Sequence, residues 1–321
     1  MHDNIQLYHE TLICKWKDGK VAAYSVGGDD SLRSQLYFAI PEMDRRGIHG
    51  TWWVNPGRGG STNFKNQDDS WANCWISSYE EWKAAASHGH DFANHTMHHL
   101  GAMSYEEAER EIRQTAEAIW EANPSQQLQL FDRGGGTSWG ISENELTEIL
   151  TRYDCVQGRG GGIEDATWQV NPSADTLREY VDTAVREASW HHVAFHGIGP
   201  NCEWGGPVDG NAFLALLDYL IEKKDQVWTG THTEVHKYEE ERNASTIKLL
   251  QVSDDRICLQ LTSTKDSRLY DYPLTLRTQI PANWKNIHVT KNGAPISHIT
   301  FKDFVYYDAV PGRDEIIISS T

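Results

Sequence analysis

The segment SYEEWKAAASHGHDFANHTMHH, residues 78–99, contains the pattern that decides the fold. Its first half has a serine before an acidic turn and a glycine at its end, which predicts a capped helix over 78–89. Its second half, HDFANHT, predicts a buried strand that ends at a group of histidines. A helix that leads directly into a strand is part of a βαβ unit, so the segment indicates an α/β fold.

The same alternation extends on both sides, over residues 21–240. Helices are predicted at four further places: 31–46, 104–123, about 175–189 and 211–224. Strands are predicted at 21–26 and 47–55, and in the runs LQLF, YDCVQG, HHVAFHG and QVWTGTH. Strands that alternate with helices in this way indicate a parallel sheet covered by helices.

The pattern changes after Glu240, where strand-like runs follow one another without a helix. These runs are IKLLQVS, RICLQLTS, YPLTLRTQI, NIHVTKNG, HITFKDFVYY and EIIISS. Short strands separated by turn residues are typical of an antiparallel β-sandwich. We therefore expect two domains, a (β/α) domain over residues 1–240 and a C-terminal β-sandwich over residues 241–321.

Composition excludes several classes of protein. The 321 residues include 29 Lys and Arg against 46 Asp and Glu, a formal net charge of −17, which opposes nucleic acid or anionic lipid as the main partner. The five cysteines include no CxxC pair, so neither a disulfide scaffold nor a Cys-rich zinc module is expected. Cys74 and Cys202 lie in two predicted loops, where two free thiols are favoured over a disulfide.

No apolar run approaches the ~18 residues that span a bilayer, so membrane insertion is not expected. The first 20 residues also lack the apolar core of a signal peptide. We expect the protein to act inside the cell, or outside the cytoplasm if a leader precedes the given sequence.

Aspartates and histidines gather at the ends of the predicted strands. Asp29 and Asp30 follow the first strand, where one could bind a cation and the other move a proton. His95 and His99 are four residues apart, so on a helix they would share one face and one metal. His196 follows a later apolar strand. Each feature alone has an ordinary structural explanation: a turn for the aspartates, chance spacing for the histidine pair and core packing for His196. Together the three features indicate one site.

These residues carry a resemblance to a known family. VGGDDS, with Asp29 and Asp30, is similar to the strand ending in Thr-Phe-Asp-Asp-Gly that opens the polysaccharide deacetylases, the NodB-homology proteins of carbohydrate esterase family 4. HTMHH (95–99) matches the family's His-Ser/Thr-x-x-His, and AFH, ending at His196, resembles its late Leu-x-His. The resemblance covers about residues 20–240.

The resemblance implies a distorted (β/α) barrel of seven strands and one divalent metal per chain, usually zinc. The metal ligands that it implies are Asp30, His95 and His99. It further implies that Asp29 is the general base that takes a proton from a metal-activated water, and that His196 is the general acid.

One motif departs from the family. The family has Arg-x-Pro, whose arginine orients the catalytic aspartate, but this chain has FDRGGGT without the proline. Arg133 is the expected catalytic arginine, Asp132 could instead occupy its position, and Arg159 in QGRGGG is the second candidate.

Tryptophans are numerous near the predicted strand ends. Aromatic faces suit sugar rings, although any single tryptophan is more often core packing. The expected substrate contacts are Trp53, Trp71, Trp75, Trp139 and Trp204.

We therefore predict a metal-dependent hydrolase that removes acetyl groups from a polysaccharide or oligosaccharide, with N-deacetylation favoured by its frequency in the family. One alternative is an O-acetyl esterase that acts on acetylated xylan or a similar polymer. Others are a non-catalytic carbohydrate-binding protein on the same fold and a metal hydrolase of a non-sugar amide. Acetylated carbohydrate is the expected partner, and the sequence leaves the oligomeric state open.

Overall fold

The computed structural model describes residues 10–59, 76–167, 171–199 and 207–320. The chain divides into two compact units, one of residues 22–236 and one that joins the N-terminal residues up to Val21 with residues 237–321. No helix among the described residues is both long enough and apolar enough for a membrane span.

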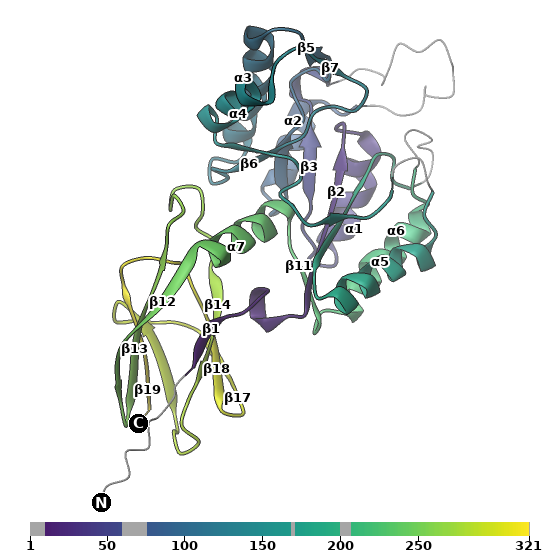
Figure 1. Ribbon diagram of the computed structural model, residues 1–321. Helices are drawn as coiled ribbons and strands as arrows, with labels where there is room; N and C mark the ends of the chain where they lie inside the picture. The colour runs from purple at the N-terminus through teal and green to yellow at the C-terminus, as the bar shows by residue number, and fades with distance from the viewer. Residues whose placement is uncertain (1–9, 60–75, 168–170, 200–206, 321) are drawn as a thin grey trace, which may run out of the picture. The chain divides into compact units, whose positions relative to one another are not determined.

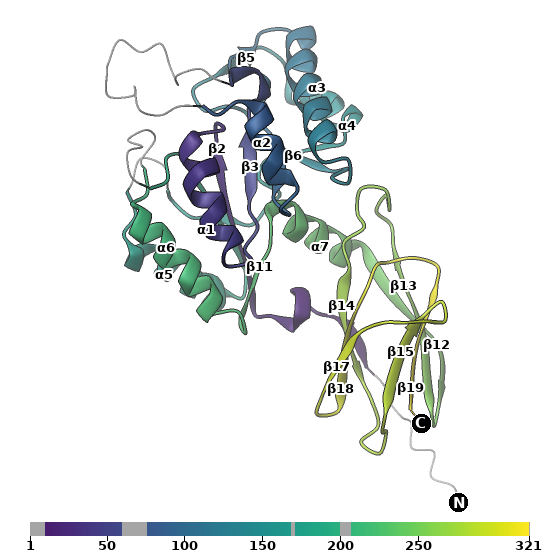
Figure 2. The same ribbon diagram turned by 180° about the vertical axis from the view of Figure 1, so that it is seen from behind.

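The first unit is built on one curled, parallel sheet (Figures 1 and 2). Its strands lie in the order β8-β6-β4-β3-β2-β10-β9, and β11 also pairs with β2. In chain order they are β2 (Ala22–Asp29), β3 (Thr51–Val54), β4 (Asp91–Asn94), β6 (Gln129–Phe131), β8 (Cys155–Gln157), β9 (Ile163–Glu164), β10 (Trp190–Phe195) and β11 (Val227–Thr229). The expected distorted (β/α) barrel is confirmed, with eight described strands rather than seven.

Helices connect these strands and cover the outer face of the sheet. They are the π turn η2 (Gln35–Ala39), α1 (Ile40–Asp44), α2 (Tyr79–Ala86), α3 (Tyr105–Ala122), α4 (Glu143–Arg152), α5 (Ala174–Glu187) and α6 (Gly210–Glu222). The last helix, α7 (His232–Ala244), follows β11 and continues the chain into the second unit. A capping box of Ser78 and Glu81 begins α2, as the sequence pattern predicts. A 3-10 turn, η3 (Pro56–Arg58), follows β3, and a separate pair of short strands, β5 (Gly101–Ala102) and β7 (Ser138–Trp139), lies near α3.

Alternation along the strands decides which side chains form the core. Tyr24, Val26, Trp52 and Val54 point outward into the main apolar core beneath the helices. Trp53, which follows Trp52, points to the other face and packs with Ala93 and Leu130. The interior of the curled sheet is therefore filled by side chains, and polar groups gather at the carboxyl ends of the strands.

The second unit contains two antiparallel sheets, which confirms the expected β-sandwich class. One sheet has β1 (Thr11–Ile13), β14 (Leu274–Gln279), β18 (Phe304–Ala309) and β17 (His298–Phe301), and the turn η1 (Lys17–Gly19) follows β1. The other sheet has β12 (Ser245–Ser253), β13 (Arg256–Ser263), β19 (Glu315–Ser320), β15 (Ile287–Lys291) and β16 (Ala294–Pro295). Inward residues such as Leu259, Ile316 and Leu276 are fully buried.

The division of the chain differs from the expected domains at its N-terminal end. Strand β1 pairs antiparallel with β14, from Thr11 opposite Thr278 to Ile13 opposite Leu276. Residues 10–21 therefore group with the C-terminal unit rather than with the (β/α) unit, and the second boundary falls after His236, within α7.

Candidate active site

The candidate site is built at the carboxyl ends of the parallel strands. Asp29 ends β2, His95 follows β4 and Asp132 follows β6. Arg159 comes shortly after β8, and His196 follows β10. Because parallel strands end at one edge of a sheet, these side chains meet although they are far apart in the sequence.

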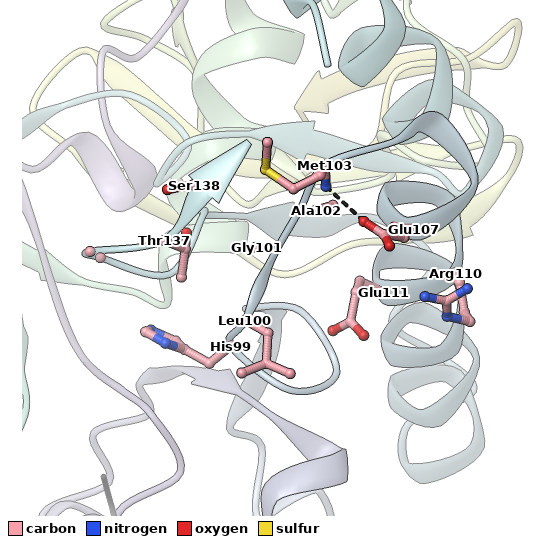
Figure 3. A pocket seen from close by; sticks show the side chains of 12 residues that line it. His99, Leu100, Gly101, Ala102, Met103, Glu107, Arg110, Glu111, Thr137 and Ser138 are labelled. Atoms are coloured by element: carbon pink, nitrogen blue, oxygen red, sulfur yellow. Dashed lines mark hydrogen bonds between the residues drawn. The ribbon is translucent and has the colours of Figure 1, made fainter. Parts of the chain in front are cut away.

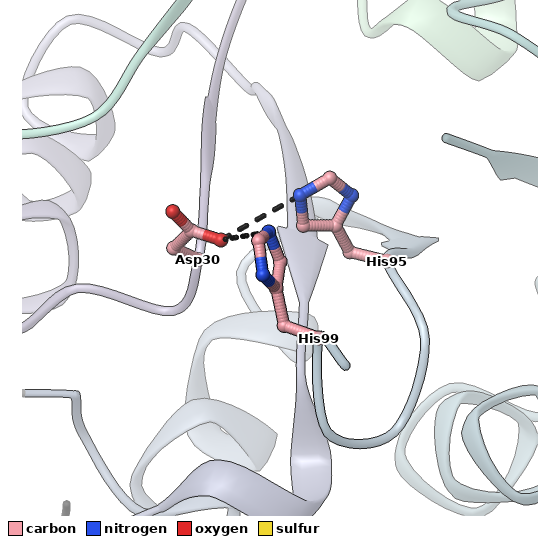
Figure 4. A group of neighbouring side chains, drawn as sticks. All are labelled: Asp30, His95 and His99. Atoms are coloured by element: carbon pink, nitrogen blue, oxygen red, sulfur yellow. Dashed lines mark ion pairs between the residues drawn. The ribbon is translucent and has the colours of Figure 1, made fainter. Parts of the chain in front are cut away.

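Three side chains form a group that could hold a metal ion (Figure 4). The Nε2 atoms of His95 and His99 lie 3.5 and 3.2 Å from Asp30 Oδ1. The three side chains are only 1–7% exposed. Neither carboxylate oxygen of Asp30 accepts a hydrogen bond within the described part of the chain. Its ion pair with Arg58 is long, with Nη1 3.8 Å from Oδ1. A buried carboxylate without a hydrogen-bond donor remains costly unless a cation binds it directly.

The environment of the two rings also fits a cation. His95 Nδ1 lies 2.9 Å from the carbonyl oxygen of Asp132, which can only accept, so Nδ1 donates and Nε2 is the ring nitrogen that faces Asp30. Burial lowers the pKa of His99, with Asp30 opposing, and the neutral ring is the form that binds metals. Aspartate with two histidines is a donor set that suits a divalent ion such as zinc. The three residues therefore fit the implied metal.

The two histidines do not lie on a helix, which corrects the geometry that their spacing suggested. They flank an irregular loop in which Thr96 and His99 have φ angles of +67° and +56°. Asn55 Nδ2 donates to the carbonyl oxygens of His95 and Thr96, and the Thr96 amide donates to Asn94. Hydrogen bonds from neighbouring strands thus hold a strained backbone, a feature that concentrates at functional sites. Nothing in the sequence pattern singled out Asn55.

His98 is directed away from the Asp30 group. Its Nδ1 lies 2.9 Å from Glu111 Oε1, and its side chain is 43% exposed. Substitution of His98 is therefore a matched control for substitution of His99.

We expect His99→Ala to lose bound zinc and His98→Ala to retain one equivalent, because only His99 faces Asp30. Zinc content after dialysis, measured by atomic absorption, gives the comparison. Equal zinc in both variants would remove His99 from the ligand set.

Asp29 forms a two-bond ion pair with Arg159. Arg159 donates to both of its oxygens, at 3.0 and 2.7 Å, and also lies 2.9 Å from Asp132. The guanidinium of Arg159 lies over the ring of Trp53, 4.3 Å from its centroid. Burial alone would raise the pKa of Asp29, but Arg159, helped by His95 and His196, holds it well below its ordinary value. Asp29 is therefore ionised across the neutral range.

The expected catalytic arginine is corrected by this geometry. Arg133 donates to Glu143 at 2.7 Å and lies over the ring of Trp139. Its charge is therefore paired at the surface with Glu143 and not with Asp29. Arg159, the second candidate, is the arginine that binds Asp29. The only sequence feature that marks Arg159 is its position in a glycine-rich run after a strand, where Gly158 and Gly160 adopt φ angles near +87° and +88°.

His196 faces both aspartates. Its Nε2 lies 3.9 Å from Asp29 Oδ2 and 3.7 Å from Asp30 Oδ2. Burial lowers the pKa of His196, and the two carboxylates oppose that effect. The imidazole of His196 thus lies within 4 Å of both buried carboxylates.

The tryptophan predictions divide into three outcomes. Trp53 is fully buried, so it is wrong as a sugar platform and instead supports Arg159. Trp139 is partly exposed. Trp71, Trp75 and Trp204 lie outside the described residues, as do Cys74 and Cys202. Cys14, Cys155 and Cys258 are free thiols, all buried.

A pocket of about 520 Å³ shares His99 with the candidate metal group (Figure 3). Leu100 and Met103 lie in its wall with 77% and 66% of their surfaces exposed, and Thr137 and Ser138 add hydroxyl groups. The remaining lining residues are Gly101, Ala102, Glu107, Arg110, Glu111, Gly135 and Gly136. Apolar surface beside hydroxyl and charged groups is suited to a sugar ring.

Parts of this chain are similar to known proteins. Residues 29–148 match the family model described as polysaccharide deacetylase. A curated relative, a gellan lyase from a Bacillus species, is 22% identical over 348 residues, which cover 98% of this chain. The chain spans only 13% of that relative's length.

Solved structures of similar proteins include a family 4 carbohydrate esterase from Streptomyces lividans in complex with acetate. It is 16% identical, with a TM-score of 0.41 over 66% of this chain and 93% of its own. A putative polysaccharide deacetylase from Mycobacterium smegmatis is 13% identical, with a TM-score of 0.46 over 70% of this chain and 92% of its own.

Proposed function

The chain contains a polysaccharide deacetylase domain, and from this premise we propose that it is a metal-dependent hydrolase that removes acetyl groups from a polysaccharide or oligosaccharide. The observation that carries the proposal is the buried group of Asp30, His95 and His99 beside an ionised Asp29. A carbohydrate-binding protein would have no need for a buried carboxylate without hydrogen-bond donors next to a base held by an arginine.

Asp30, His95 and His99 would hold the metal, which when bound acidifies a water molecule and polarises the acetyl carbonyl. Asp29 accepts the proton that the attacking water loses, and Arg159 keeps the carboxylate ionised and oriented for this step. His196, 3.9 Å from Asp29, donates a proton to the departing nitrogen or oxygen. The same base, metal and acid would serve the hydrolysis of an acetyl amide and of an acetyl ester, and we favour the amide as substrate.

The substrate is expected to extend past the scissile acetyl group. The pocket beside His99 would hold a neighbouring sugar unit, with Leu100 and Met103 against its apolar face. Trp139 belongs to the same β5–β7 region and is the described tryptophan that we retain as a substrate contact.

Acetate release over a panel of substrates tests this function. The panel contains chitin oligosaccharides, peptidoglycan and acetylated xylan, together with gellan because of the curated relative. Release from an N-acetyl glycan supports the amide, release from xylan alone supports the esterase alternative, and binding without release supports the non-catalytic one.

His196→Ala adds a mechanistic prediction. An amide needs protonation of its leaving nitrogen, whereas an activated aryl acetate needs little, so the variant should lose about 10²–10⁴-fold on the amide and much less on the aryl acetate. The measurement is kcat on both substrates at one pH. Equal losses on the two substrates would contradict the role of His196 as the acid.

A further inference from the structure

Gln35 is a fully buried polar residue at the start of the π turn η2, between the strands that carry Asp29 and His196. Its Nε2 atom lies 2.6 Å from the carbonyl oxygen of Asp29, 2.9 Å from that of His196 and 3.2 Å from that of Phe195. Its Oε1 accepts a hydrogen bond from the Leu32 amide at 3.2 Å. One amide group thus joins the main chain of both residues that we propose as base and acid.

The position of Gln35 follows from where the sheet ends. The ladder between β2 and β10 stops at the pair Gly28–Phe195. The carbonyl groups of Asp29 and His196 lie beyond that pair and need a donor other than this ladder. Gln35 supplies this donor, and its π turn is a type of backbone distortion that occurs frequently at functional sites.

Gly28 makes room for this contact. A Cβ atom at Gly28 would lie 2.8 Å from Gln35 Nε2 and 2.9 Å from the Phe195 carbonyl oxygen, too close for any side chain. Gly28 occupies the position where the resembling family has phenylalanine before its two aspartates. The glycine at position 28 is therefore what allows Gln35 to lie between the two strands.

We propose that Gln35 is a positioning residue that fixes the separation of Asp29 and His196. The inference rests on the proposed function, since it gives Gln35 a role in that reaction. Asp29 Oδ2 and His196 Nε2 are 3.9 Å apart, although Asp29 ends β2 and His196 follows β10. A displacement of about 1 Å between reacting groups can cost about 10²-fold in rate, so a donor that joins the two main chains protects catalysis.

The test compares Gln35→Met with Gln126→Met. Gln126 is also buried, donates to the Phe92 carbonyl at 2.5 Å and accepts from the Phe92 amide at 3.0 Å, but it lies near the start of β4, away from the site. Methionine keeps the length of the side chain and removes the amide in both variants. Both should lose stability, but only Gln35→Met should lose about 10²-fold in kcat on the amide substrate, with zinc content and KM near the wild-type values.

Hydrogen–deuterium exchange supplies a readout that does not depend on activity. Gln35→Met should exchange faster than wild type at residues 196–199, and Gln126→Met should not. If the two variants have the same kcat in folded, zinc-loaded protein, or if exchange at 196–199 is unchanged, the positioning role is overturned while the deacetylase function stands. If the wild type releases no acetate from any substrate, the proposed function fails. The exchange comparison alone then decides whether Gln35 holds the main chain at Asp29 and His196 together.

Discussion

Asp29→Asn is expected to lower acetate release by about 10²–10⁴-fold while the protein keeps its full zinc content. The asparagine preserves the size of the side chain but cannot accept the proton of the attacking water. Asp29 is not a member of the Asp30, His95 and His99 group, so the metal site is retained. The measurements are kcat/KM on the best substrate of the panel and zinc content of the same preparation.

Asp30→Asn is the matched control, because it makes the same chemical change one residue later. Asp30 is 1% exposed, and its carboxylate faces both histidines, so this variant should bind zinc weakly. If the outcomes are exchanged, with zinc lost in Asp29→Asn and retained in Asp30→Asn, the roles of the two residues are reversed. Full activity in both variants would make GGDDS an ordinary turn and end the deacetylase interpretation.

Arg159→Met is expected to lower kcat/KM by about 10²-fold at neutral pH, because it removes the group that orients the Asp29 carboxylate. Burial raises the pKa of Asp29 and Arg159 opposes this effect, so removal of the guanidinium lets the pKa rise. A smaller fraction of Asp29 is then ionised at a given pH, and the acidic limb of kcat/KM should move to higher pH than in the wild type. The measurement is kcat/KM between pH 4 and pH 9, starting from the wild-type profile.

Arg133→Met is the control for this prediction. Arg133 pairs with Glu143 at the surface, so its loss should leave kcat/KM within about tenfold and the acidic limb in place. A shift of the acidic limb in Arg133→Met and not in Arg159→Met would restore the assignment that the sequence first suggested.

The fold was largely predictable because its elements are marked locally. Ser78 and Ser104 begin helices where acidic turns follow them, and the apolar strands between these helices match the observed sheet. Strands of two residues, such as β5 and β9, carry no periodicity and exist because a neighbouring backbone lies beside them. The pairing of β1 with β14 joins residues 267 positions apart, such as Thr11 and Thr278, so no local pattern could assign residues 10–21 to the C-terminal unit.

The site was predictable to the extent that strand ends converge. Asp30, His95 and His99 lie together as expected, although through an irregular loop instead of a helix. The sequence could not choose between Arg133 and Arg159, because each follows a predicted strand and only the folded backbone brings one of them to Asp29. No sequence pattern pointed to Gln35, because its three acceptors are main-chain carbonyl groups, which any residue provides.

The central claim is that a metal held by Asp30, His95 and His99 makes this chain a carbohydrate deacetylase. The measurement that tests it most directly is acetate release by the wild-type protein stripped of metal and then titrated with zinc, on the substrate identified by the panel. We expect no release from the metal-free protein and a rise to a plateau at one equivalent of zinc per chain. Release that is unchanged by metal removal, or a zinc-loaded protein that binds glycans and releases no acetate, would contradict the account.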